Sequence, residues 1–215
     1  MGFVSRMKAV DYRKALLRAA GELFTARGYA GVTMEDVLAE VGGSKSTMYK
    51  HFGDKTELFR AAVESLLDER LAPLRSFTPG DADLTSTLIA LGGHFATVAL
   101  SPASIALHRL VTAEAERVPG LGAAFFEHGP AVGQAVLGGY LRQACDAGLI
   151  ALPDPVKAAA QLYQAMLGDA QMRLLTGAPT LPTGDEIRES IVDAVHFFLH
   201  GVSRWPAGGP DVRPA

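Results

Sequence analysis

Apolar residues recur at intervals of three and four positions along most of the chain, whereas the alternation of apolar and polar residues typical of a half-buried strand persists nowhere. The sequence therefore predicts an all-α protein. Helical patterns occupy 11–27, two short stretches within 33–52, 55 to about 73, 84–100, 102–117, 120–147, 154–176 and 185–203.

Glycine and proline separate these helical patterns and indicate the limits of the domains. Residues 1–10 read as a loose basic arm, and residues 204–215, rich in proline and glycine, read as a frayed tail. Between them we expect a small N-terminal domain over 11–71 and a larger helical domain over 83–203. The turn-forming segment from Phe77 to Asp83 is expected to link the two.

The stretch 33–52 has the pattern of two short helices joined by a tight turn. Thr33 can cap the first helix, with Asp36 as its capping-box partner, and Ser44 can cap the second. Gly42-Gly43 between them can adopt the left-handed backbone that ends a helix. The apolar positions are Met34, Val37, Leu38 and Val41 in the first helix and only Met48 and Phe52 in the second.

The outward surface of that second helix holds cations, hydroxyls and a phenol, which are groups that donate to phosphate oxygens and reach base edges. A short helix, a glycine turn and a polar second helix form the helix-turn-helix arrangement, in which the second helix enters the major groove. A solvated loop between two core helices is the simpler alternative, but every local signal favours the two helices.

Several segments carry a motif in a fixed order: Gly28-Tyr29, Thr33, the run Gly42-Gly-Ser-Lys-Ser-Thr-Met-Tyr-Lys-His-Phe-Gly-Asp-Lys55, and Glu57-Leu58. From about Asp11 to about Leu67 the chain resembles the N-terminal domain of the TetR family of transcriptional regulators. A softer resemblance to one TetR subgroup runs from Arg109 to Pro155. Gly43 stands where the family usually has a small apolar residue, which would loosen the turn. Ser46 stands where glycine is frequent and adds a hydroxyl near DNA.

This resemblance implies a homodimeric regulator that binds a near-palindromic double-stranded DNA operator. Family membership alone favours a repressor over an activator. Its two reader helices would enter successive major grooves about 34–36 Å apart. Thr33, Tyr49 and Lys55 would hold phosphates. The full set of expected DNA contacts is Thr33, Ser44, Lys45, Ser46, Thr47, Tyr49, Lys50, His51 and Lys55.

The resemblance also implies a small, largely apolar effector, of unknown identity, among the helices of the larger domain. Residues expected to line its pocket are His94, Phe95, His108, Phe125, Phe126, Tyr140 and Met166. Plain core packing is the alternative for each of them. The two histidines are favoured because a polar group among apolar helices needs a partner, which a ligand can supply. A regulator without an effector is the alternative for the whole chain.

The last two helical patterns, 154–176 and 185–203, carry more apolar surface than one buried stripe requires. The surplus predicts a two-fold four-helix interface between subunits, where TetR-like proteins also dimerise. The expected interface residues are Leu162, Tyr163, Met166, Val192, Val195, Phe198 and Leu199.

Charge is distributed unevenly along the chain, whose formal net charge is -3. Residues 1–55 hold nine Lys and Arg against six Asp and Glu, and the remainder holds eleven against seventeen. A basic head on an acidic body suits a protein that presents only its head to DNA. The single cysteine, Cys145, allows no internal disulfide, and no signal-peptide or membrane-spanning run is apparent, so we expect a cytoplasmic protein.

No catalytic constellation is apparent, and the sequence predicts neither an enzyme, a metal site nor a cofactor. His196 and His200 have the i, i+4 spacing of a zinc-binding pair, but they lack the glutamate base and a third ligand. Two other functions stay open at this point. One is an enzymatic body targeted by a DNA-binding head, and the other is an architectural DNA binder without sequence preference.

Overall fold

The computed structural model describes residues 9–77 and 82–201, and every regular element in these ranges is an α-helix. The expected arm and tail thus lie wholly or almost wholly outside the described residues, as does most of the linker. The ten helices are α1 (Ala9–Arg27), α2 (Met34–Val41), α3 (Lys45–Phe52), α4 (Lys55–Arg75), α5 (Leu84–Ala99), α6 (Pro102–Glu114), α7 (Leu121–His128), α8 (Pro130–Asp146), α9 (Pro155–Thr176) and α10 (Gly184–His200). The prediction of an all-α fold is confirmed.

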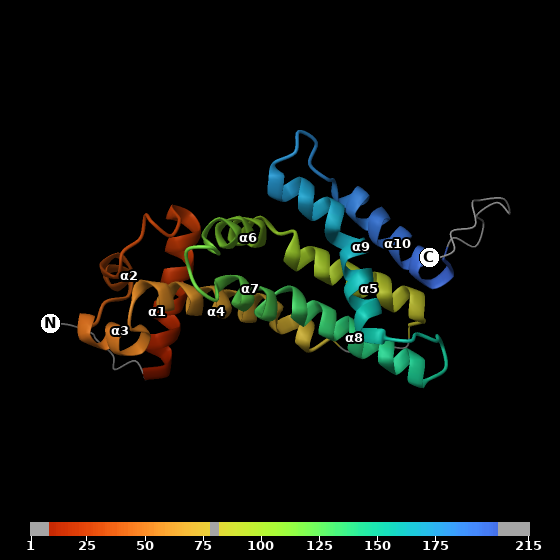
Figure 1. Cartoon of the computed structure of the whole chain (residues 1–215), viewed down its shortest axis with the longest axis horizontal. Helices are drawn as coiled ribbons and strands as arrows, with labels where there is room; N and C mark the ends of the chain where they lie inside the picture. Colours follow the sequence, from red (N-terminus) through yellow and green to blue (C-terminus); the bar gives the residue numbers. More distant parts are fainter. Residues whose placement is uncertain (1–8, 78–81, 202–215) are drawn as a thin grey trace, which may run out of the picture.

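Two apolar cores divide the molecule (Figure 1), and α4 belongs to both. The first half of α4 packs with α1, α2 and α3, for example through the buried Leu58 and Phe59. Its last turns place Leu71 and Leu74 in the second core with α5, α8, α9 and α10. Residues from α6 to the start of α7, among them Leu107, complete the first core. The larger domain therefore rests directly on the N-terminal helices.

Capping carboxylates begin two of the longer helices. The Asp54 carboxylate accepts a hydrogen bond from the amide of Glu57 at 2.9 Å and begins α4. The Asp154 carboxylate accepts from the first-turn amides of α9 at 3.0 Å, with Pro155 at the first helical position, where its missing N–H costs nothing.

The predicted helix 120–147 is wrong as a single element, because the structure breaks it at Gly129 into α7 and α8. A Cβ at Gly129 would lie 2.6 Å from the carbonyl oxygen of Phe125, and Pro130 has no N–H to continue the helix. Two smaller corrections concern helix ends. The helix from 102 ends at Glu114, and α4 continues past Pro73 to Arg75.

No single helix in the described ranges has both the length and the apolar composition to cross a membrane. Only α5 and α6 taken together meet the criterion, across a bend of 64°.

Candidate nucleic-acid interface and body pocket

Helices α2 and α3, which are joined by the turn at Gly42-Gly43, each begin at a capping side chain. The Thr33 hydroxyl accepts from the amide of Asp36 at 3.1 Å, while the Asp36 carboxylate accepts from the Thr33 amide at 2.7 Å. The Thr33 hydroxyl also donates to the Asp36 carboxylate at 2.7 Å, and this bond, with the one from the Thr33 amide, holds the pKa of the Asp36 carboxyl below its usual value. The Ser44 hydroxyl accepts from the amide of Thr47 at 3.1 Å and begins α3. Thr33 and Ser44, both expected DNA contacts, thus also fix the two helices.

Tyr12 of α1 braces the same turn. Its hydroxyl donates to the carbonyl oxygen of Gly42 at 3.0 Å. Gly43 adopts φ +99, and a Cβ there would lie 2.4 Å from the Tyr12 hydroxyl oxygen. Glycine at 43 therefore leaves room for the brace, so the expectation of a loosened turn needs correction.

Helix α3 is attached by two side chains and exposed elsewhere. Met48 is 0% exposed and Phe52 6% exposed, which confirms the narrow apolar seam. The ring of Phe52 also lies under the Arg13 guanidinium, 5.3 Å from the ring centroid. The exposed residues of α3 are Lys45, Ser46, Thr47, Tyr49 and Lys50, and His51 is half-buried. The structure thus gathers most of the predicted DNA contacts on one helix.

Lys45 is already engaged within the chain. Its ammonium forms an ion pair with the Glu35 carboxylate of α2, and it also lies over the ring of Tyr49, 5.8 Å from the centroid. The hydrogen bond between the two charged groups lowers the pKa of Glu35 and raises that of Lys45. Both side chains are largely exposed, so the pair is weak and a phosphate can compete for the lysine. Sequence reasoning missed Glu35, whose role needs α2 and α3 side by side.

Lys55 lies in the first turn of α4, where amides without helical partners favour an anion. Its ammonium lies 4.4 Å from the ring centroid of Tyr29, and the Tyr29 hydroxyl shares a hydrogen bond of 3.1 Å with Thr56. The aromatic ring therefore holds the cation beside the helix start, ready for a phosphate.

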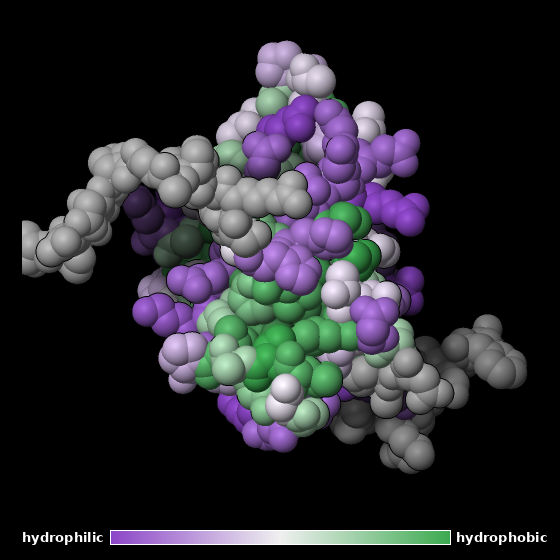
Figure 2. All heavy atoms as spheres, turned by 90° about the vertical axis from the view of Figure 1, so that its right-hand side faces the viewer, coloured by the Kyte–Doolittle hydropathy of each residue, from purple (hydrophilic) through white to green (hydrophobic). Residues whose placement is uncertain are grey.

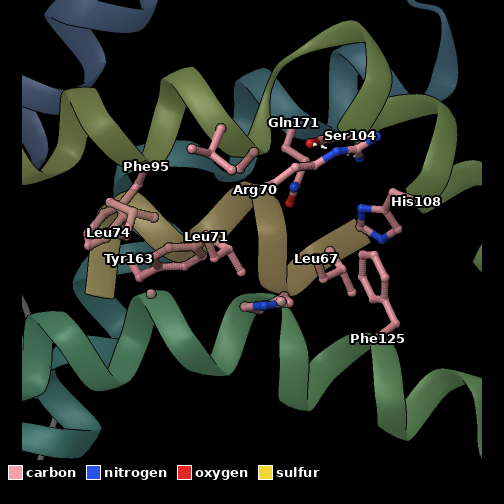
Figure 3. A pocket seen from close by; sticks show the side chains of 15 residues that line it. Leu67, Arg70, Leu71, Leu74, Phe95, Ser104, His108, Phe125, Tyr163 and Gln171 are labelled. Atoms are coloured by element: carbon pink, nitrogen blue, oxygen red, sulfur yellow. Dashed lines mark hydrogen bonds between the residues drawn. The ribbon is translucent and has the colours of Figure 1, made fainter. Parts of the chain in front are cut away.

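A pocket of about 530 Å³, counting space that opens to solvent, lies between helices α4 to α9. Leu71, Leu74, Phe95 and Tyr163 gather on one side of it, while His108 and Phe125 face each other on the other side (Figure 3). Arg70, Ser104 and Gln171 lie between these groups. A second, more open hollow of about 960 Å³ between α5 and α10 contains none of the expected pocket residues.

Three of the seven residues expected at the pocket, Phe95, His108 and Phe125, line it. The other four do not. His94 is exposed on α5, and Phe126 is 51% exposed on α7. Met166 is buried in the second core and Tyr140 packs against that core, so for both residues the alternative of plain core packing holds. Arg70, Ser104, Tyr163 and Gln171 were missed as pocket residues because their helices meet only in the folded chain.

Burial sets the ionisation of the pocket's titratable groups. It lowers the pKa of the His108 imidazole, whose ring lies 4.8 Å from that of Phe125, and this favours the neutral form. It raises the pKa of the Tyr163 phenol to about 12. It also lowers the pKa of the Arg70 guanidinium, which donates to the Ala103 carbonyl oxygen at 3.2 Å. That arginine remains charged, because its ordinary pKa is far above neutrality.

The expected dimer-interface residues fall into two groups. Leu162, Tyr163, Met166 and Val195 are buried inside the chain's own core, so they cannot also form a subunit interface, and their assignment is corrected. Val192, Phe198 and Leu199 are half-buried. Three apolar side chains of α9 and α10 are more than half exposed: Val156, Met172 and Phe197. Figure 2 shows apolar side chains gathered over one area at the α10 end of the molecule, bordered by polar ones.

His196 and His200 lie with their ring centroids 6.1 Å apart on α10. Within residues 9–77 and 82–201, no third His, Cys, Asp or Glu joins them in a cluster that could hold a metal ion.

Two family models match the chain. Residues 16–62 match the model of bacterial regulatory proteins of the tetR family, and residues 86–201 match the model of the AefR-like transcriptional repressor, C-terminal domain.

Curated relatives match a part of the chain. The transcriptional activator FasR of Mycolicibacterium smegmatis is 34% identical over 71 residues, which is 33% of this chain and 32% of FasR. The transcriptional regulator TcmR of Streptomyces glaucescens is 31% identical over 116 residues, 51% of this chain and 50% of TcmR. These matches therefore span about a third to a half of each relative's length.

Solved structures extend the similarity to the whole fold. A TetR-family regulator from Mesorhizobium loti superposes with a TM-score of 0.77 at 26% identity, covering 90% of this chain and 98% of that one. The flavonoid-responsive regulator FrrA superposes with a TM-score of 0.72 at 27% identity, covering 87% and 95%. Because the two family models together span both the helix-turn-helix and the helical body, the chain belongs to the TetR family of DNA-binding transcriptional regulators.

Proposed function

We propose that the protein represses transcription by binding a near-palindromic operator with α3 as the reader helix. The observation that carries this proposal is the surface of α3, where only Met48 and Phe52 are buried and the cations and hydroxyls face outward. Lys50, Tyr49 and Lys55 would contact phosphates or base edges. The matching model of the helical body is named for a repressor, and the relative FasR is named as an activator.

The operator-bound form is a homodimer in this proposal. A single α3 reads only a few base pairs, and a two-fold dimer reads two half-sites about one helical turn apart. The exposed Val156, Met172 and Phe197 of α9 and α10, together with the half-buried Val192 and Phe198, supply apolar surface for a four-helix contact.

A small molecule in the body pocket would release the operator. The pocket lies against the last turns of α4, and the first turn of the same helix holds Lys55 at the DNA side. A ligand that fits better when α4 is tilted would favour a dimer whose two α3 helices no longer match the operator.

Binding to the DNA upstream of the protein's own coding region, compared with scrambled DNA at near-physiological salt, tests the proposal. We expect one dimer on a short dyad, with binding reduced in Lys50→Ala and preserved in Arg142→Ala, which removes an exposed cation from α8. Equal, weak and strongly salt-dependent binding to both DNAs would favour the architectural alternative. Loss of sequence-specific binding in the Arg142→Ala control would also count against the assigned surface.

A further inference from the structure

The pocket contains a half-buried cation, Arg70, whose guanidinium has no carboxylate hydrogen-bonded to it among residues 9–77 and 82–201; the neighbouring Glu69 acts on it through charge alone. Arg70 projects from α4, and its Nη1 donates to the Ala103 carbonyl oxygen at 3.2 Å and, more weakly, to the Ser104 hydroxyl at 3.5 Å. Arg60 and Arg75 of the same helix each have a carboxylate partner. Arg70 therefore keeps unused donors in a partly desolvated place.

The rest of the pocket separates into polar and apolar parts. Gln171 and Ser104 lie beside Arg70, whereas Leu71, Leu74 and Phe95 form a wall without polar groups (Figure 3). A desolvated guanidinium gains most from a planar anion that accepts two parallel hydrogen bonds. A wholly apolar ligand would leave Arg70 without such a partner. It would also shield the guanidinium from water, which would make the ligand's binding free energy less favourable.

We propose that the pocket selects an amphipathic carboxylate, whose anionic group pairs with Arg70 and whose aliphatic or aromatic body lies against Leu71, Leu74 and Phe95. Ser104 and Gln171 supply further hydrogen bonds to the carboxylate. This inference rests on the proposed role of the pocket as an effector site, and it replaces the largely apolar effector with an acid. The site itself is defined by Arg70 and does not depend on which DNA the protein binds.

Paired probes that differ only in charge test the proposal on the full-length protein. Octanoate, 4-phenylbutyrate and 1-naphthylacetate are each compared with the matching carboxamide by calorimetry and thermal shift. We expect at least one acid to bind roughly tenfold to a hundredfold more tightly than its amide, the range of a charged hydrogen-bonded pair. Arg70→Met should lower the acid's affinity to that of the amide and leave the amide unchanged, and Arg142→Met should change neither.

Equal affinity of acid and amide for the wild-type protein would overturn the proposal without any variant, and so would the absence of acid binding at millimolar concentration. A preference for the acid that persists in Arg70→Met would overturn it too. Operator release is measured separately. A neutral compound that releases the operator would preserve the proposed function and refute the carboxylate. Arg70-dependent acid binding that leaves the DNA complex intact would support the carboxylate and count against effector release.

Discussion

Replacing Gly43 by alanine should destabilise the head through two separate effects. The first is the left-handed backbone, since φ +99 disfavours a residue with a Cβ by roughly 1–2 kcal/mol. The second is the contact of the new Cβ with Tyr12, 2.4 Å from its hydroxyl oxygen. The end of the tyrosine side chain must swing away, and its hydrogen bond to the Gly42 carbonyl, worth about 1 kcal/mol, is lost. We expect a total cost of about 2–3 kcal/mol.

Gly42→Ala is the matched control for this prediction. Gly42 has φ +77 with ψ -173, a backbone region that essentially only glycine occupies, and nothing lies within 4 Å of the Cβ it would carry, so only a backbone cost of about 1–3 kcal/mol applies. Urea unfolding followed by circular dichroism measures both variants, with Tyr12→Phe reporting the hydrogen bond alone. Operator affinity should fall in the same order, because the turn orients α3. If Tyr12→Phe leaves the free energy of unfolding unchanged, Tyr12 does not brace the turn and the reasoning fails.

Three further predictions concern other parts of the molecule. Glu35→Gln should free Lys45 to contact a phosphate, which should tighten DNA binding and steepen the slope of log K against log salt by about one. An unchanged slope would contradict the assigned role of Lys45. Phe197→Asp should convert dimers to monomers in sedimentation at micromolar concentration, because burying a 62% exposed phenyl ring supplies about 3 kcal/mol per subunit. Leu149→Asp, in the α8–α9 loop and 64% exposed, should leave association unchanged, and equal effects would refute the interface. Burial lowers the pKa of His108 in the folded state below its unfolded value, so the contribution of His108 to stability is lost as pH falls below about 6.5. The variant His108→Gln should therefore show a smaller drop in the free energy of unfolding between about pH 7.5 and 5.5. A drop equal to that of the wild-type protein would contradict the pKa shift.

The helix-turn-helix was predictable because its determinants are local. Thr33, Ser44 and Asp54 each cap a helix that begins at the next residue, and Gly42-Gly43 ends the helix before. Each signal acts within four or five positions of the chain, so the sequence displays it directly. The brace from Tyr12 acts over thirty positions and was invisible for that reason.

The pocket was predicted only in part because its wall comes from six helices, α4 to α9. Arg70 follows Glu69 on a helix rich in charges and reads as a solvated surface residue. Its burial arises from α6 lying over it. The sequence showed that α9 has more apolar residues than one buried stripe requires. It did not show which of them pack inside the chain and which are left for a second subunit. Packing against α5, α8 and α10 uses Leu162 and Met166, and leaves Val156 and Met172 outside.

In the proposed mechanism, helix α4 connects the pocket to the DNA-binding end of the chain. Arg70 follows Lys55 by fifteen residues, about 22 Å along a continuous helix. Two side chains tie the pocket end of α4 to the body: Arg70, through the Ala103 carbonyl and the Ser104 hydroxyl, and Asp68, through His128 at 3.1 Å. Burial opposes ionisation of Asp68, but hydrogen bonds from Arg75 and His128 outweigh it and keep its pKa below the usual value.

A carboxylate that takes Arg70 from Ala103 would break one of these two ties and leave the other. Helix α4 would then pivot about the Asp68–His128 contact, and because Leu58 and Phe59 bind its first half to α2 and α3, the reader helix would move with it. The shift away from the operator-bound form is limited by how much more tightly the ligand binds when Arg70 is displaced than when it is not, because a ligand shifts an equilibrium only by its difference in affinity for the two states. An acid that binds both positions of Arg70 equally would occupy the pocket and leave the operator bound.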